Sequence, residues 1–258
     1  MTDPQSLTSM SGDAMHRVLA KHRQARKHLE AFDKAVRDFI GDDPCRTEGR
    51  LSDDHMEYVF TAHDVKTVPE EISLLAGDVV HNCRACLDHL AWEISMAPDG
   101  KTSFPILRSP SKDGPEITGG ISAAHQQALD AVQPYKISPG SPDDALLEIL
   151  RKLDNDDKHK VVLASVSSID GNVHGMPRHY AGRSPETEYE WGALEEGGRV
   201  ATFRCSEPSP HMTISDFKLI PSVSLTGISS AKVPAEARDL LTTLHKLVAE
   251  IVATFDPL

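Results

Sequence analysis

The stretch that most constrains the fold runs from residue 70 to residue 96, where apolar side chains recur at helical spacing. Pro69 and two glutamates open it, because proline suits a first helical turn and acidic residues suit the positive end of the helix dipole. At about 100° per residue, one half of this helix is apolar. Its apolar members are Leu74, Leu75, Val79, Val80, Cys83, Cys86, Leu87, Leu90 and Ile94. The sequence therefore predicts a long central helix that packs against other helices.

The other half of this helix is polar, but it does not have the composition of an ordinary wet surface. Its members are Asp78, His81, Asn82, Arg84, Asp88, His89 and Glu93, with Trp92 among them. A solvent-facing helix surface usually carries lysine and glutamate. Histidine, arginine, asparagine and tryptophan are instead typical of a buried polar site or an interface.

The remaining patterns predict an α+β protein. Helical spacing recurs at residues 13–40, 122–133, 143–154 and 234–255, and β-branched runs predict strands near 58–62, 161–166, 199–205 and 211–225. Residues 101–121 and 170–198 are rich in turn-forming residues and are expected to form loops. We expect a disordered segment at residues 1–12 and a single domain at 13–258. In that domain a predominantly helical bundle (13–155 and 234–255) would carry a small antiparallel β-sheet from the β-rich segment at about 160–225.

Composition limits where such a protein acts and what it binds. The chain has 258 residues and a net charge of −12, which argues against non-specific coating of nucleic acid. Residues 16–37 nevertheless hold seven Lys/Arg against two acidic residues. This basic helix is either a solvated face or a guide for a polyanion. No membrane span, signal sequence or disulfide framework is evident, so a cytoplasmic protein is expected.

Arg84 and His89 are the strongest candidates for chemistry. Five residues apart on a helix, they lie about 140° apart around the axis and about 7.5 Å apart along it, so they can flank a phosphodiester. Arginine binds phosphate through paired hydrogen bonds, and histidine can transfer a proton near neutral pH. The pair suits metal-independent RNA cleavage by the ribose 2′-hydroxyl. Candidate orienting or substrate-binding residues are His81, Asn82, Asp88, Lys158 and His159.

An arginine followed five residues later by a histidine, near the middle of a long helix, resembles the motif of the HEPN superfamily. The resemblance implies an endoribonuclease without metal or other cofactor, acting as a toxin or in phage defence. It also implies a homodimer in which the two Arg84/His89 motifs face each other, with RNA as substrate and an antitoxin or other regulatory partner. The strings at 77–90, 104–106 and 155–159 also resemble an uncharacterised actinobacterial and phage family.

Two other interpretations fit the same residues. The polar residues of the central helix could form a satisfied network in a bundle or dimer seam, completed by Asp157, Lys158 and His159. The protein would then be a non-catalytic binding or scaffold protein. Alternatively, the potential ligands Asp78, His81, His89, Asp157 and His159 suggest a metal-dependent hydrolase. They lack the close spacing of known metal pairs, so no metal is predicted. Cys83 and Cys86 lie on the apolar half, which predicts core packing.

Overall fold

The computed structural model describes residues 12–112, 114–159, 164–173, 186–190, 192–212, 214, 217–225 and 236–255. The predicted disorder at 1–12 lies outside this range except for Gly12. The helices are α1 (Gly12–Gly41), α2 (Glu70–Ile94), α3 (Ala123–Ala131), α4 (Pro134–Ile137), the 3-10 helix η1 (Pro142–Asp144), α5 (Leu146–His159) and α6 (Ala237–Phe255). The strands are β1 (Arg46–Leu51), β2 (Glu57–His63), β3 (Ala164–Val173), β4 (Glu186–Tyr189), β5 (Gly192–Ala193), β6 (Arg199–Arg204) and β7 (Phe217–Leu225).

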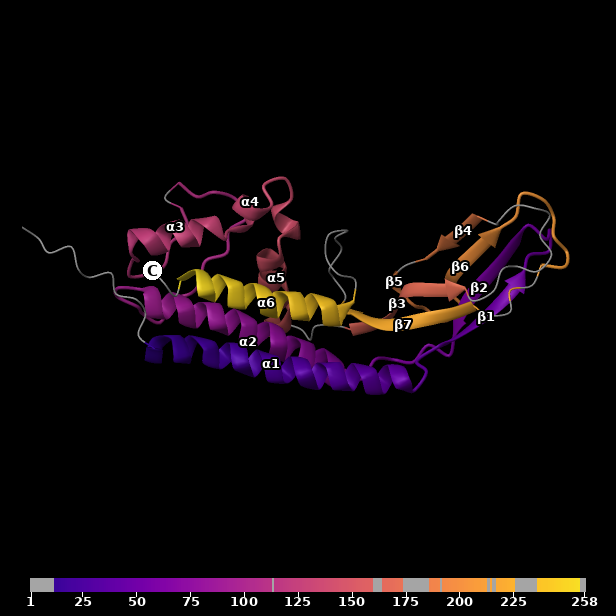
Figure 1. The fold of residues 1–258 in the computed structure, drawn as a ribbon, viewed down its shortest axis with the longest axis horizontal. Coiled ribbons are helices and arrows are strands. Elements are labelled where there is room, and N and C mark those ends of the chain that lie inside the picture. The colour runs from indigo at the N-terminus through magenta and orange to yellow at the C-terminus, as the bar shows by residue number, and fades with distance from the viewer. Residues whose placement is uncertain are drawn as a thin grey trace, which may run out of the picture.

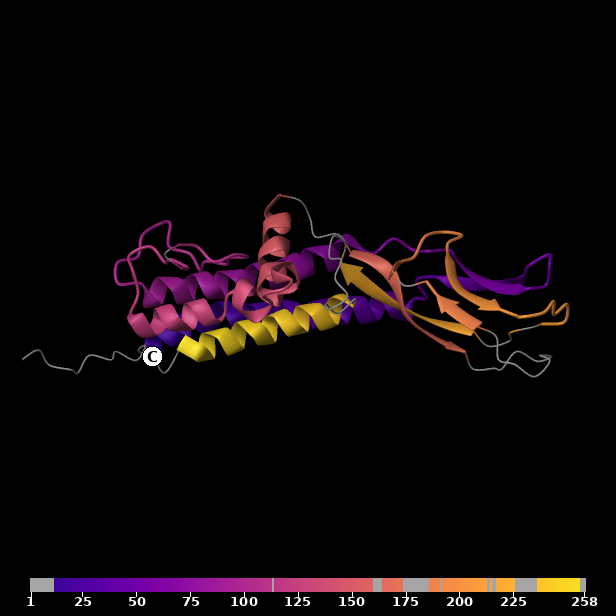
Figure 2. The same cartoon turned by 90° about the horizontal axis from the view of Figure 1, so that it is seen from above.

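The molecule is elongated, with the helices gathered at one end and the strands at the other (Figures 1 and 2). Helices α1, α2 and α6 lie side by side, and α5 runs across them. An α+β architecture is therefore confirmed. None of the described helices combines the length and apolarity needed to cross a bilayer.

The core of the bundle follows the apolar stripes read from the sequence. Helix α2 is buried on the sides that meet α1, α5 and α6, and it buries both Leu87 and Leu90 completely. Helix α6 buries a stripe that ends at Phe255, whose ring meets Phe104 edge-on at 6.3 Å between centroids. Phe104 thus fixes the loop after α2 to the core. The predicted apolar half of the central helix is confirmed except at Leu74, which is exposed.

The strands form two antiparallel sheets rather than one. The four-stranded sheet has the order β1-β2-β6-β4, and the three-stranded sheet has the order β5-β3-β7. Strands β1 and β2 pair as a hairpin between α1 and α2, with Glu48 opposite Thr61. The strand predicted at 58–62 is therefore confirmed as part of β2, and the stretch assigned to the helical bundle, 13–155, contributes half of one sheet.

In the strand-rich lobe the loop predicted at 170–198 was wrong, whereas the strands predicted near 161–166, 199–205 and 211–225 are confirmed over part of their length. Residues 170–198 do not form only a loop, because β3 extends to Val173 and β4 and β5 follow. The strand predicted at 161–166 is described only from Ala164, and the one predicted at 211–225 only from Phe217. The glycine and polar residues of β3 have low strand propensity, but β7 supplies their backbone partners across the whole strand.

The loop after α2 depends on Gly119, whose φ of +87° lies in the left-handed region. A Cβ at this position would lie 2.1 Å from the carbonyl oxygen of Ala97. We expect Gly119→Ala to lower the free energy of unfolding by about 1–3 kcal/mol, since strain and the backbone clash act together. Chemical denaturation measures this loss. Gly140→Ala is the matched control because its Cβ meets no atom within 4 Å. Equal losses in the two variants would contradict the prediction.

Candidate functional site

The exposed face of α2 carries an unusual stripe of side chains. Leu74, Asp78, His81, Ala85, His89 and Trp92 fall within an arc of roughly 80° on the helical wheel, and Met96 follows two residues after the helix ends. Leu74, Trp92 and Met96 are 51%, 46% and 72% exposed, and they are three of the five strongly exposed large apolar residues in the described part of the chain. Exposed apolar residues gathered on one helix face mark an interaction surface. We call these seven residues the α2 stripe.

Arg84 lies beside the α2 stripe and is held within the protein. Its Nη2 atom lies 2.9 Å from Oδ1 of Asp88 and donates a hydrogen bond of 2.7 Å to the carbonyl oxygen of Phe104. The same Asp88 oxygen accepts a hydrogen bond of 2.9 Å from the Phe104 amide. The Arg84 side chain is only 13% exposed. Arg84 and Asp88 therefore clamp the loop that carries Phe104 onto α2.

One nitrogen of the Arg84 guanidinium makes no hydrogen bond in the described part of the chain. Nη1 of Arg84 is buried and has no hydrogen-bond partner among the described residues. A buried donor without an acceptor costs free energy, so Arg84 is held in place at some cost in stability.

His89 lies on the opposite flank of the α2 stripe and is exposed. It lines a groove of about 560 Å³ together with Arg17, Asp88, Trp92 and Thr102. Glu93 forms one wall, and its carboxylate accepts hydrogen bonds of 2.7 and 3.0 Å from Arg17 of α1. No hydrogen bond engages the His89 imidazole among the residues that the structure describes. His89 is therefore available to a ligand in this groove.

Asp88 connects the two predicted catalytic residues. Its carboxylate is bound to Arg84 on one side, and its side chain also lines the groove that contains His89. Arg84 does not line that groove. Within one chain, then, Asp88 contacts Arg84 and shares a groove with His89, whereas no contact joins Arg84 and His89 among the described residues.

A second polar cluster forms where α5 meets α2. Asp154 is buried, and its Oδ2 accepts a hydrogen bond of 2.6 Å from Nζ of Lys158. Its other oxygen lies 3.6 Å from Nδ1 of His81. Lys158 therefore acts on α2 through Asp154, a residue that the sequence did not single out. The side chain of His159 lies outside the described residues.

The other predicted residues of α2 have structural roles. Asn82 is buried and donates a hydrogen bond of 2.8 Å to the carbonyl oxygen of Asp78 within its own helix, so it does not lie on the polar face as predicted. Cys83 and Cys86 are fully buried, and burial raises the pKa of each thiol to about 12. Their predicted core packing is confirmed. Among the described residues, no three histidine, cysteine, aspartate or glutamate side chains converge as a metal site.

Asp157, which belongs to the polar cluster between α5 and α2, makes the free energy of unfolding depend on pH. Burial raises the pKa of Asp157, and the negative charges of Asp78 and Asp154 add to this effect, while His81 and Lys158 oppose it. The folded protein thus binds this proton more tightly than the unfolded chain. Between the ordinary carboxyl pKa of about 3.9 and the raised value, this group lowers the free energy of unfolding as pH rises.

We therefore expect Asp157→Asn to raise the melting temperature at pH 7, because the amide removes a carboxylate ionised in an unfavourable place. The gain should be smaller at pH 4, because the raised pKa leaves more of the native Asp157 protonated at that pH. Thermal unfolding at both pH values measures the difference. Asp156→Asn on the same turn is the control. A gain of equal size at the two pH values would contradict the assignment.

The basic helix predicted at 16–37 is α1, and part of its charge is compensated. Arg17, Arg26 and Lys34 pair with Glu93, Glu30 and Asp38, respectively. For Lys21 and Lys27 no ion pair is found among the described residues. The sequence did not predict that Arg17 and Glu93 would build the wall beside His89, since the contact joins residues 76 positions apart.

Comparison of the chain with protein-family models, curated proteins and solved structures finds no match. The relationship to the HEPN superfamily therefore stays a prediction from the spacing of Arg84 and His89.

Proposed function

We propose that this protein is a homodimeric, metal-independent endoribonuclease of HEPN type, in which His89 is the general acid/base and Arg84 binds phosphate. The observation that carries the proposal is the exposed His89 imidazole, which lines a groove with Trp92 and Arg17 and has no hydrogen bond within the described chain. A toxin or phage-defence role, with a regulatory partner, follows from the same resemblance.

The chemistry needs one proton acceptor and one cation. The ribose 2′-oxygen attacks the neighbouring phosphorus as its proton passes to a base, and the departing 5′-oxygen receives a proton. The products end in a 2′,3′-cyclic phosphate and a 5′-hydroxyl. A histidine near neutral pH can serve in these proton transfers, and an arginine stabilises the charge on the phosphoryl oxygens. Uncompensated lysines of α1 would guide RNA toward the groove.

The α2 stripe supports the second copy of the chain that this mechanism needs. Leu74 and Met96 lie equally far from Ala85 in sequence, as do His81 and His89. If two antiparallel α2 helices cross at Ala85, the small side chain permits close approach. Leu74 then lies near the C-terminal end of the partner's α2, and His89 lies level with the partner subunit's His81. Such a self-complementary patch is what a two-fold dimer requires.

A non-catalytic binding or scaffold protein is the second candidate, and the position of Arg84 favours it. This guanidinium already binds Asp88 and the backbone of Phe104. An arginine held in this way stabilises a loop without any role in catalysis. In this case the α2 stripe would still form the dimer seam.

Incubation of total RNA and of tRNA with the wild-type protein in excess EDTA tests the first proposal, with sedimentation analysis of the same sample. We expect a dimer and RNA fragments that end in 2′,3′-cyclic phosphate. An intact RNA pool in the presence of a folded dimer would favour the scaffold role. Cleavage that disappears in EDTA and returns with a divalent cation would instead indicate a metal-dependent hydrolase.

A further inference from the structure

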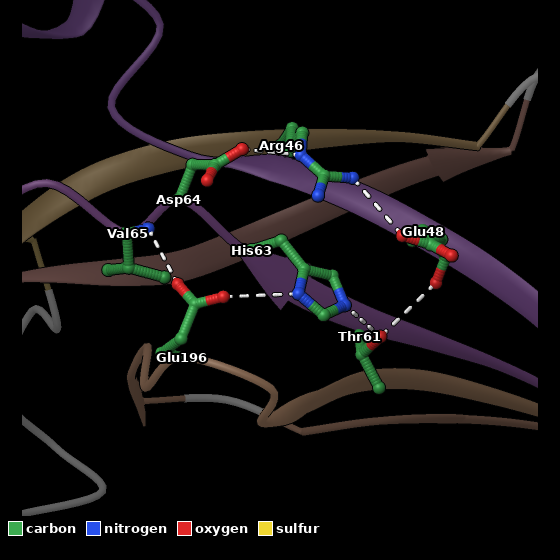
Figure 3. Close-up of polar contacts among 7 residues, drawn as sticks. All are labelled: Arg46, Glu48, Thr61, His63, Asp64, Val65 and Glu196. Atoms are coloured by element: carbon green, nitrogen blue, oxygen red, sulfur yellow. Dashed lines mark hydrogen bonds and ion pairs between the residues drawn. The ribbon is translucent and has the colours of Figure 1, made fainter.

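A separate polar cluster lies on the outward face of the four-stranded sheet (Figure 3). Thr61 and His63 are two positions apart on β2 and therefore share this face. Nε2 of His63 lies 2.9 Å from Oγ1 of Thr61, and its Nδ1 lies 3.1 Å from Oε1 of Glu196. The other oxygen of Glu196 accepts a hydrogen bond of 3.1 Å from the amide of Val65. The imidazole is thus held between a hydroxyl and an anchored carboxylate.

With the imidazole neutral, the roles of its two nitrogens follow from their partners. An ionised carboxylate only accepts, so Nδ1 of neutral His63 carries the hydrogen that Glu196 receives. Nε2 is then an acceptor 2.9 Å from the Thr61 hydroxyl, whose hydrogen also has the carbonyl oxygen of Glu48 as an acceptor at 3.4 Å. The order hydroxyl, imidazole, carboxylate is the arrangement in which a histidine activates a hydroxyl nucleophile.

Thr61 and His63 line a groove of about 570 Å³. Arg50 and Arg199 also line it, as do the carboxylate residues Glu48 and Asp53. Arg199 is the direct neighbour of Thr61 across the β2–β6 pair, and side chains at such positions are about 5 Å apart at their Cβ atoms. A substrate in this groove would therefore reach the hydroxyl and a guanidinium together.

The charges of the sheet face favour an anionic substrate. Arg46 and Arg204 each pair with two carboxylates. Arg50 meets Asp53 only at 3.8 Å, with both side chains highly exposed, and Arg199 has no carboxylate partner among the described residues. Arg50 and Arg199 thus remain the weakly compensated cations of the groove that Thr61 lines.

We propose that Thr61, His63 and Glu196 form an acyl-transfer site for small anionic carboxylic esters. Oγ1 of Thr61 attacks the ester carbonyl carbon while its proton passes to Nε2 of His63. Arg199 faces the oxyanion that forms. The C–O bond to the alcohol then breaks, and the alcohol leaves with the proton from His63. Water hydrolyses the acyl-threonine with the same base, which releases the acid and restores the hydroxyl. Glu196 is a positioning residue.

Hydrolysis of mono-p-nitrophenyl succinate by the full-length protein tests this site, with neutral p-nitrophenyl butyrate as the matched ester. We expect wild type to prefer the succinate ester, and Arg50→Gln to remove that preference. Thr61→Val, which keeps the shape without the hydroxyl, and His63→Ala should each lose at least about 100-fold in rate. Thr61→Ser should keep or exceed the wild-type rate, because it retains the hydroxyl and removes a methyl group.

The remaining measurements separate this role from a merely structural one. In Glu196→Gln, kcat should fall while KM stays near the wild-type value, because Glu196 orients the imidazole and does not bind the substrate. Mass spectrometry should place a succinyl group on Thr61 in samples quenched early. Circular dichroism confirms that each variant is folded. Undiminished hydrolysis by Thr61→Val, or no hydrolysis of either ester by folded wild type, would overturn the proposal. The RNA cleavage assay does not depend on these residues, so the two proposals can fail independently.

Discussion

In the His89→Ala variant, RNA cleavage is expected to fall at least about 100-fold, the usual contribution of a general acid or base. The side chain is exposed, and no hydrogen bond to it is found in the described part of the chain, so its removal leaves no buried partner unsatisfied. The melting temperature should therefore stay within a few degrees of wild type. Cleavage of a labelled tRNA in EDTA, with thermal unfolding of the same samples, measures both effects.

His211→Ala is the control for this experiment, because His211 is also exposed and lies between β6 and β7, in the strand-rich lobe. It should cleave RNA like wild type. Arg84→Ala should differ from both variants, since it loses activity and also releases Asp88 and the Phe104 carbonyl group. Undiminished cleavage by His89→Ala would remove this histidine from the mechanism. A large loss of stability in His89→Ala would assign it a structural role.

The Phe104→Ala variant is expected to lose about 3–5 kcal/mol in the free energy of unfolding, the range measured when a buried phenylalanine is truncated. Phe104 is 1% exposed, and it packs against Phe255 of α6. The cavity would lie where the loop after α2 meets α6. Because Asp88 and Arg84 both bind the backbone of Phe104, that clamp should weaken as well.

Urea denaturation at neutral pH measures the loss in Phe104→Ala. Ile137→Ala is the control because Ile137 is also a large apolar residue but is exposed, and its change should stay within about 0.5 kcal/mol. A loss below about 1 kcal/mol in Phe104→Ala would mean that the loop is not held by this side chain.

Much of the helical bundle could be predicted because its residues satisfy local and tertiary requirements together. The stripe from Leu240 to Phe255 predicts α6, and the same stripe is buried in the structure. Burial of Cys83 and Cys86 followed from their place on the apolar half of α2. A residue on the apolar half of a helix is buried whichever partner helix covers it. Hydrophobic periodicity was therefore sufficient to predict its burial.

The site could be predicted only in part. The sequence placed Arg84, Asp88 and His89 on one helix, but helical spacing says nothing about the partner of a side chain. Arg84 binds a backbone carbonyl 20 residues away, and Arg17 reaches Glu93 across 76 residues. Likewise, the hydrogen bond between His63 and Glu196 joins residues that are 133 positions apart. No local pattern encodes such contacts.

The helical stripes, the long central helix, and the concentration of histidine, arginine and tryptophan on one of its faces can all be predicted from the residues alone. These properties depend on hydrophobic periodicity and residue chemistry, which are local. Two other features follow from tertiary contacts: Arg84 is bound by Asp88 and Phe104 while His89 is exposed, and the β1–β2 hairpin pairs with β6 to form a polar sheet face. Both features depend on backbone groups and charges that are far apart in the sequence and become neighbours only in the folded protein.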